Sequence, residues 1–188
     1  AALFLGRTNM STSPDAVFFG PTPGFLTTFG ASVALADITG DGRAEAIVGG
    51  PGYGTTGIGP NSSLNGRGTA VVFANIGGVI DSTPDLTLFG ENTADLFGAT
   101  VAAGDVNGDG TNDVVVYAPY ATNGHGPSYA ETGAAYVYRG RAGAMPSSTP
   151  SWILVCRGRG DVTRGGVDFT GTGQANNAGR FMTVGDVD

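Results

Sequence analysis

The chain has 188 residues, of which 40% are hydrophobic, and this is enough for a domain with a buried core. Its formal net charge is −7, with nine arginines and no lysine, which argues against nucleic acid or an anionic membrane surface as a partner. No apolar run approaches the length of a membrane span, so membrane insertion is not expected.

Glycine and proline divide the sequence into short segments. The 34 glycines and 10 prolines lie between brief apolar runs, and no helical periodicity is visible. This pattern is typical of many short strands joined by tight turns. The sequence therefore predicts an all-β fold.

The chain opens with two apolar runs, Ala2–Leu5 and Val17–Phe19. The sequon Asn9-Met-Ser11 lies between them, and it is an N-glycosylation acceptor if the protein is secreted through a eukaryotic pathway. Similar runs recur later as the third and fourth strands of a repeating unit. We therefore expect residues 1–20 to form strands three and four of one unit.

Residues 25–90 contain the first complete unit. Its first strand shows apolar alternation at Val33 and Leu35 and leads into an acidic loop at residues 37–45. The runs that follow are Glu45–Gly50, Ala70–Phe73 and Leu86–Phe89. The unit is thus predicted to have four strands. A second sequon, Asn61-Ser-Ser63, lies in a turn-rich segment of this unit.

Residues 93–158 repeat the same order, with an acidic loop at residues 105–113. Residues 159–177 are expected to form an insertion loop. They contain Arg159-Gly160-Asp161, the tripeptide that integrins recognise in their ligands, which is either an adhesion motif or a chance match. Residues 178–188 are expected to supply the first strand and a partial loop of a further unit.

Four-stranded units of about 66–70 residues in tandem indicate a β-propeller, each unit being one blade. The chain is expected to hold fewer than three blades, so the ring is incomplete in this chain. Further blades would come from a longer chain or from other chains. Five aromatic residues at strand positions are expected in the core: Phe18, Phe19, Phe89, Tyr136 and Tyr138.

The loop at residues 105–113 has oxygen-bearing side chains at its first, third, fifth and ninth positions. These are Asp105, Asn107, Asp109 and Asp113, and the glycine at the sixth position permits a sharp turn. A cage of oxygen ligands suits a hard cation, and calcium is its usual occupant. The sequence therefore predicts a calcium loop.

The loop at residues 37–45 is a near copy, with Asp37, Thr39, Asp41 and Glu45 at the same positions. Six of the sixteen acidic residues lie in the two loops, and such crowded carboxylates repel one another unless a cation neutralises them. An EF-hand is excluded, since it needs flanking helices and a glutamate at position twelve, where this chain has Val48 and Val116.

The motif Phe-Gly-Ala-Ser/Thr-Val, followed by the acidic loop and a Gly/Ala-Pro turn, occurs twice. The Phe-Gly pairs are Phe29-Gly30 and Phe97-Gly98, and the turns end at Pro51 and Pro119. The sequence over about residues 25–158 resembles the FG-GAP repeats of integrin α-subunit propellers. In that family the acidic loop joins the first two strands of a blade, and calcium holds it at the rim of the ring.

The resemblance also implies a ligand set. It adds the backbone carbonyls of Arg43 and Thr111, at the seventh position, to the side chains already named. Thr39 and Glu45 depart from the residues usual in the family, so we expect the second loop to bind calcium more tightly. Asp186 and Asp188 match the first and third positions of an incomplete third loop.

The function expected from these features is a non-catalytic, extracellular, calcium-binding propeller for adhesion or protein–protein assembly, with other protein chains as partners. His125 is the single histidine, and no serine or cysteine nucleophile is evident beside it, so an enzyme is not expected. Two alternatives remain open: a glycan-binding lectin propeller, and the accessory propeller of a larger secreted enzyme resembling GPI-specific phospholipase D.

Overall fold

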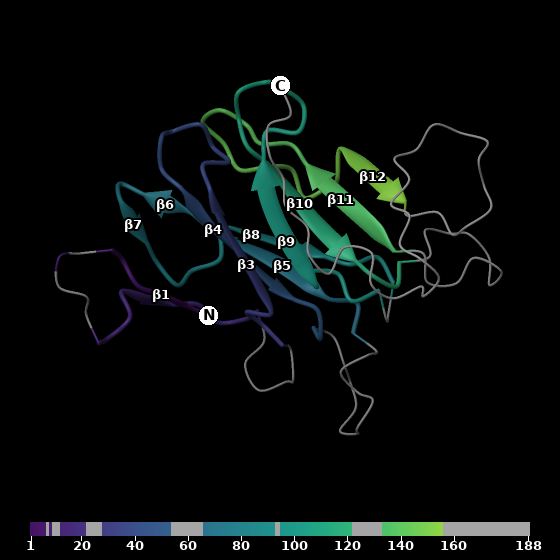
Figure 1. Cartoon of the computed structure of the whole chain (residues 1–188), viewed down its shortest axis with the longest axis horizontal. Helices are drawn as coiled ribbons and strands as arrows, with labels where there is room; N and C mark the ends of the chain where they lie inside the picture. The colour runs from purple at the N-terminus through teal and green to yellow at the C-terminus, as the bar shows by residue number, and fades with distance from the viewer. Residues whose placement is uncertain are drawn as a thin grey trace.

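The computed structural model describes residues 1–6, 8, 12–21, 28–53, 66–92, 95–121 and 133–155. In these ranges the chain forms β-strands and no helix, as the sequence predicts (Figure 1). The strands are β1 (Ala2–Leu3), β2 (Ala16–Val17), β3 (Ser32–Ala36), β4 (Glu45–Gly50), β5 (Thr69–Phe73), β6 (Asn75–Ile76), β7 (Val79–Ile80), β8 (Leu86–Phe89), β9 (Thr100–Gly104), β10 (Asp113–Ala118), β11 (Ala134–Tyr138) and β12 (Trp152–Val155).

Two four-stranded antiparallel sheets form the body of the molecule. The first has the strand order β3-β4-β5-β8 and the second β9-β10-β11-β12, so both follow the order of the chain. The short hairpin β6–β7 lies in the connection between β5 and β8, where the sequence reading had no strand. Neither sheet closes on itself. The architecture is that of two propeller blades in an incomplete ring.

The two sheets pack face to face, with β3 and β9 side by side (Figure 1). One apolar cluster fills the space between them. It draws on Ile47, Val72 and Leu88 from the first sheet and on Val114 and Val116 from the second. Every residue of β4, β5, β10 and β11 is buried, as expected for inner strands covered on both faces.

The opposite face of the first sheet packs against the β1–β2 pair. Phe18 lies on this face with its ring 4.4 Å from that of Phe73, and Phe29 approaches the same ring at 6.5 Å. Two of the five aromatic residues expected in the core are not there. Phe19 is 64% exposed because successive side chains alternate in direction and Phe18 takes the buried position. Phe89 is 38% exposed on the edge strand β8, against Tyr53 and Arg67.

The Phe97-Gly98 turn lies at the contact between the second sheet and the first. Phe97 is fully buried, and its ring packs edge-on against Tyr136 at 5.2 Å. Gly98 has a φ of +88°, and any side chain there would collide with the backbone carbonyl of Thr69 in the neighbouring sheet. Only glycine permits both this backbone conformation and this approach between blades.

Candidate metal loops

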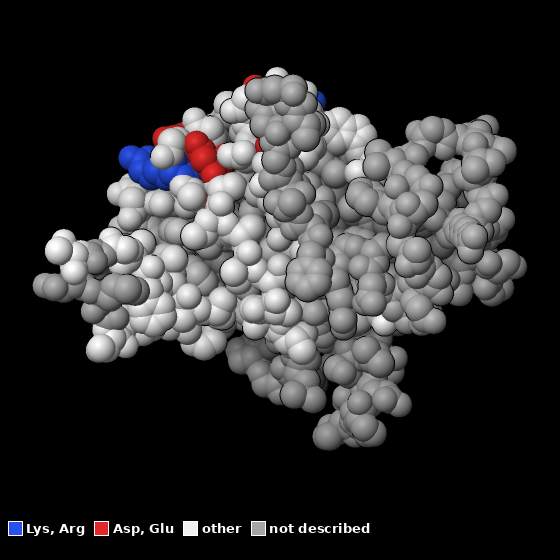
Figure 2. Space-filling view, in the orientation of Figure 1, with Lys and Arg blue, Asp and Glu red and all other residues white. Residues whose placement is uncertain are grey.

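The two acidic loops lie at the same edge of the two sheets. Residues 37–45 connect β3 to β4, and residues 105–113 connect β9 to β10, so both join the first two strands of a sheet (Figure 1). On the face seen in Figure 2, the charged atoms of the described residues gather along this edge. The fold thus brings together two loops whose first residues are separated by a whole repeat in sequence.

The two loops have the same backbone conformation. Glycines at the fourth and sixth positions have positive φ in both, at +67° and +83° in the first loop and +74° and +86° in the second. The turn wraps the backbone around the first aspartate. The Asp41 and Gly42 N–H groups donate to the Asp37 carboxylate at 3.1 and 2.7 Å, and those of Asp109 and Gly110 donate to Asp105 at the same distances.

The ninth-position carboxylates are buried and tie three segments together. Glu45 accepts from the Ile38 N–H at 2.9 Å and from the backbone of Asn75. Asp113 accepts from the Val106 N–H at 3.1 Å and from the Gly140 N–H at 2.9 Å. In each loop, therefore, this carboxylate links the second loop position to the segment that follows the third strand of the sheet.

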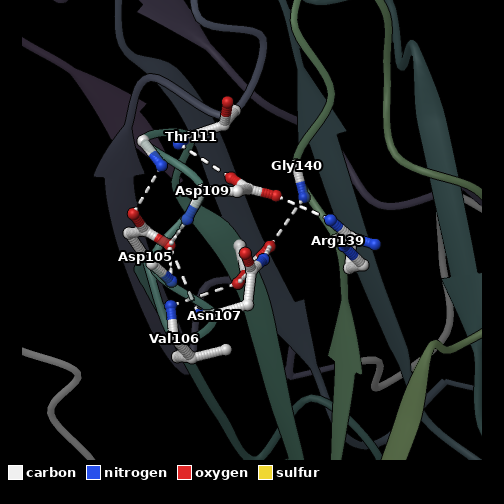
Figure 3. Close-up of polar contacts among 10 residues, drawn as sticks. Asp105, Val106, Asn107, Asp109, Thr111, Arg139 and Gly140 are labelled. Carbon is white, nitrogen blue, oxygen red and sulfur yellow. Dashed lines mark hydrogen bonds and ion pairs between the residues drawn. The ribbon is translucent and has the colours of Figure 1, made fainter.

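The second loop has further polar contacts of its own (Figure 3). The Asn107 amide donates to both oxygens of Asp113, at 3.2 and 3.0 Å. Arg139 forms an ion pair with Asp109 at 2.8 Å, and its guanidinium carbon lies 6.0 Å from the centroid of the Trp152 ring. In the first loop, Asp41 instead pairs with Arg43 of its own loop at 3.3 Å.

The electrostatics of the loops keep three aspartates negatively charged. The Gly110 N–H is the main cause that lowers the pKa of Asp105, and Arg139 is the main cause for Asp109. Desolvation raises the pKa of Asp37, but four loop N–H groups outweigh it and the pKa is lowered. Glu45 differs, because burial raises its pKa and the nearby charges of Asp37 and Asp41 add to the effect.

The donor set fits a hard cation, although the side chains do not converge on one point. No group of three acidic, histidine or cysteine side chains within the described ranges is close enough to hold a metal ion. The Asp109 carboxylate forms an ion pair with Arg139, and the Asn107 amide donates to Asp113. Both side chains would have to turn to reach a shared cation. Carboxylate, amide and carbonyl oxygens are nevertheless the ligands that calcium prefers.

Several residues of this edge were not found by reading the sequence. Arg139, Gly140, Asn75 and Asn112 contact the loops, and none of them is a ligand position of the acidic motif. Aligning the two repeats could have identified two of these residues. Asn75 and Gly140 are each the second residue after the third strand of their unit.

Other predicted residues lie outside the described part of the chain. These are the sequon residues Asn9 and Asn61, the tripeptide Arg159-Gly160-Asp161, and the third-loop residues Asp186 and Asp188. They remain predictions.

The FG-GAP repeat family model matches residues 29–73 and 97–138, each match running from the Phe-Gly turn through the acidic loop to the third strand of the sheet. The chain contains two FG-GAP repeats. The repeats explain the double occurrence of the loop, since one loop accompanies each copy.

Known proteins with similar sequences include two integrin α subunits. Mouse integrin alpha-IIb is 35% identical over 151 residues, which cover 77% of this chain and 14% of that protein. Integrin alpha-5 of Xenopus laevis is 31% identical over 160 residues, with the same two shares. Bovine phosphatidylinositol-glycan-specific phospholipase D is 32% identical over 123 residues, 64% of this chain and 14% of that protein.

The FG-GAP chain therefore spans about a seventh of the length of these relatives. Within the described residues, no helix has the length and apolar character needed to cross a bilayer.

Proposed function

We propose that this chain is a non-catalytic, extracellular propeller module that binds calcium in its two acidic loops and serves adhesion or protein–protein assembly. The observation that supports it most directly is the matched pair of loops. Both have glycines of positive φ at positions four and six and a first aspartate enclosed by backbone N–H groups. Two copies with the same geometry indicate a shared task.

The proposed ligands are the side chains of Asp37, Thr39, Asp41 and Glu45 with the Arg43 carbonyl in the first loop. In the second loop they are Asp105, Asn107, Asp109 and Asp113 with the Thr111 carbonyl. Bound calcium would neutralise the crowded carboxylates and cross-link the first two strands of each sheet. The role is structural, since it would rigidify a glycine-rich rim that presents a binding surface to another protein chain.

Thermal unfolding with and without calcium tests the proposal. When the free calcium concentration is about 100 times the Kd of one site, binding adds about 2.7 kcal/mol to the free energy of unfolding. We therefore expect 1 mM CaCl2 to raise the Tm by several degrees relative to excess EDTA. The matched control is the Asp37→Asn, Asp105→Asn double variant, which should lose the shift. Identical melting of the parent chain in calcium and in EDTA would refute the calcium role.

A second reading is the accessory propeller of a larger secreted enzyme. It is favoured by the similarity to bovine phosphatidylinositol-glycan-specific phospholipase D. Sequencing the complete transcript distinguishes the two. A catalytic domain encoded beside the blades supports the accessory role, and a transcript without one supports the adhesion or assembly module.

A further inference from the structure

The first loop is held by the neighbouring blade. Three consecutive backbone carbonyls of this loop accept hydrogen bonds from the second repeat. The Asp37 carbonyl accepts from the Asn112 side-chain amide at 3.0 Å, that of Ile38 from the Arg141 N–H at 3.1 Å, and that of Thr39 from the Gly143 N–H at 2.7 Å. The backbone that bears the first and third loop positions is thus fixed from outside its own sheet.

The segments that donate hydrogen bonds to the first loop also form part of the second loop or contact it. Asn112 is the eighth residue of the second loop, between Thr111 and Asp113. Residues 139–144, here called the bridging segment, contact both loops. At one end Arg139 pairs with Asp109 and the Gly140 N–H donates to Asp113 (Figure 3). At the other end the Arg141 and Gly143 N–H groups donate to carbonyls of the first loop.

The contact between the loops is close as well as polar. A side chain at Gly140 would collide with the Asn112 carbonyl, so the bridging segment lies directly against the second loop. A β-carbon added to Gly40 would lie 3.5 Å from the Ala142 Cα and 3.8 Å from the Thr111 hydroxyl. A rearrangement of one loop therefore displaces atoms in contact with the other.

We propose that the two loops bind calcium cooperatively, coupled through Asn112 and the bridging segment; this rests on the calcium function proposed above. Thr111 and Asp113 belong to the proposed ligand set of the second loop and flank Asn112 on both sides. Fixing them fixes the amide that holds the Asp37 carbonyl. By linkage, calcium in the first loop raises the calcium affinity of the second loop by the same factor as calcium in the second loop raises that of the first.

Calorimetric titration of the full chain with CaCl2 tests the coupling. It gives the overall constant for binding two calcium ions, so the heat of each loop need not be separated. The Asp105→Asn, Asp109→Asn variant reports the first loop alone, and Asp37→Asn, Asp41→Asn reports the second. Cooperativity predicts that the overall binding constant of the parent chain exceeds the product of these two constants by about fivefold or more. Equality of the two quantities would overturn the coupling.

A variant that alters no proposed ligand side chain isolates the route. Asn112→Leu removes the donor to Asp37 while it keeps a branched side chain, and it should lower the overall binding constant by between about threefold and tenfold, as expected for one lost hydrogen bond. Arg141→Ala is the matched control, because its exposed side chain is removed while the backbone N–H that bonds Ile38 remains. The route through Asn112 would be contradicted if the overall binding constant fell equally in both variants, or if it fell in neither of them.

Circular dichroism of each variant in EDTA establishes that it is folded. If a silenced variant loses its β-sheet spectrum, the Hill slope replaces the product test: above one for the parent chain, and near one for Asn112→Leu. Slopes of one in both would overturn the coupling while leaving calcium binding intact. A parent chain that gives no heat with CaCl2 would instead overturn the proposed function and the coupling with it.

Discussion

Arg139 places a positive charge beside a carboxylate of the second loop from outside that loop, whereas the equivalent Asp41 of the first loop pairs with Arg43 of its own loop. The equivalent residue after β5 is Ala74, whereas Arg139 donates to Asp109 at 2.8 Å from an exposed position. This cation opposes a second cation at the same carboxylate. The two loops therefore differ in their electrostatics as well as in their third and ninth residues.

Replacing Arg139 with glutamine should tighten calcium binding in the second loop. The gain should be about twofold to threefold and should shrink at high salt, because the charges are exposed and screened. Calorimetry in the Asp37→Asn, Asp41→Asn background measures this loop alone, with Arg141→Gln as the control for net charge. Weaker binding in Arg139→Gln would show that the ion pair helps to hold Asp109 in place.

Asp95 is a buried carboxylate outside the loops, only 2% exposed, just before the Phe97-Gly98 turn. It accepts hydrogen bonds from the backbone and side chain of Asn92, at 3.0 and 3.3 Å. Burial raises its pKa, and the charge of Glu91 adds to the shift. The folded state therefore binds a proton at Asp95 more readily than the unfolded state, and this residue makes stability fall as the pH rises through the raised pKa.

Asp95→Asn should remove this penalty, since an amide oxygen can accept the same hydrogen bonds without a charge. We expect a Tm about 1–3 °C higher than that of the parent chain at pH 7. The difference should shrink as the pH falls through the raised pKa, and it should vanish once the carboxyl is protonated in both the folded and the unfolded state. Thermal melts in EDTA across this range measure it; a variant less stable than the parent at pH 7 would contradict the argument.

At the scale of single elements, the Phe-Gly turn determines how one blade meets the next. Gly98 combines positive φ with a backbone contact to Thr69, whereas Gly78 in the β6–β7 turn has a φ of +91° and open space around it. Alanine at either position suffers the cost of the left-handed backbone, but only at Gly98 does it also collide with another sheet.

Gly98→Ala should lower the free energy of unfolding by about 3 kcal/mol or more, and Gly78→Ala by about 1 kcal/mol. Urea denaturation followed by circular dichroism gives both values, and their difference is the cost of the contact between blades. Equal losses in the two variants would mean that the backbone conformation alone requires glycine at position 98.

The elements that the sequence predicted are those with a local signal. The two blades follow from short apolar runs, and the loops follow from acids at fixed spacing. The β6–β7 hairpin was missed because its strands have two residues each, although Gly77-Gly78 between apolar neighbours is a hairpin signal. Phe19 was placed wrongly in the core, because the sequence does not show which of the neighbouring Phe18 and Phe19 faces inward.

The contacts around the loops were beyond local reading for a different reason. Arg139 meets Asp109 across 30 positions in sequence, and Asn112 meets Asp37 across 75. Their partners depend on how β11 lies beside β10 and how the second sheet lies against the first. A single repeat contains no information about which blade its loop will touch.

At the scale of the whole molecule, the two sheets share one core. The cluster between them contains residues from β4, β5 and β8 on one side and from β10 and β11 on the other. Neither sheet can expose its half of this cluster without exposing the other half, so the two blades should unfold together. The hydrogen bonds between the loops link the same two sheets at their rim.

Matched substitutions in the two halves of the core test this. Val72 on β5 and Val116 on β10 are both fully buried in the shared cluster, and Val→Ala at either should lower the free energy of unfolding by about 2 kcal/mol. Val79→Ala is the control, because Val79 is 66% exposed on β7 and its loss should change stability by less than about 0.5 kcal/mol.

Hydrogen–deuterium exchange of peptides from β4–β5 and from β10–β11 reads the two sheets separately. If they unfold as one unit, each core variant accelerates exchange in both sheets to the same extent, and urea melts keep a single transition. Faster exchange confined to the substituted sheet, or two transitions of which each variant shifts one, would show that the blades are independent. The bridging contacts at the rim would then join two separately stable units rather than reinforce one core.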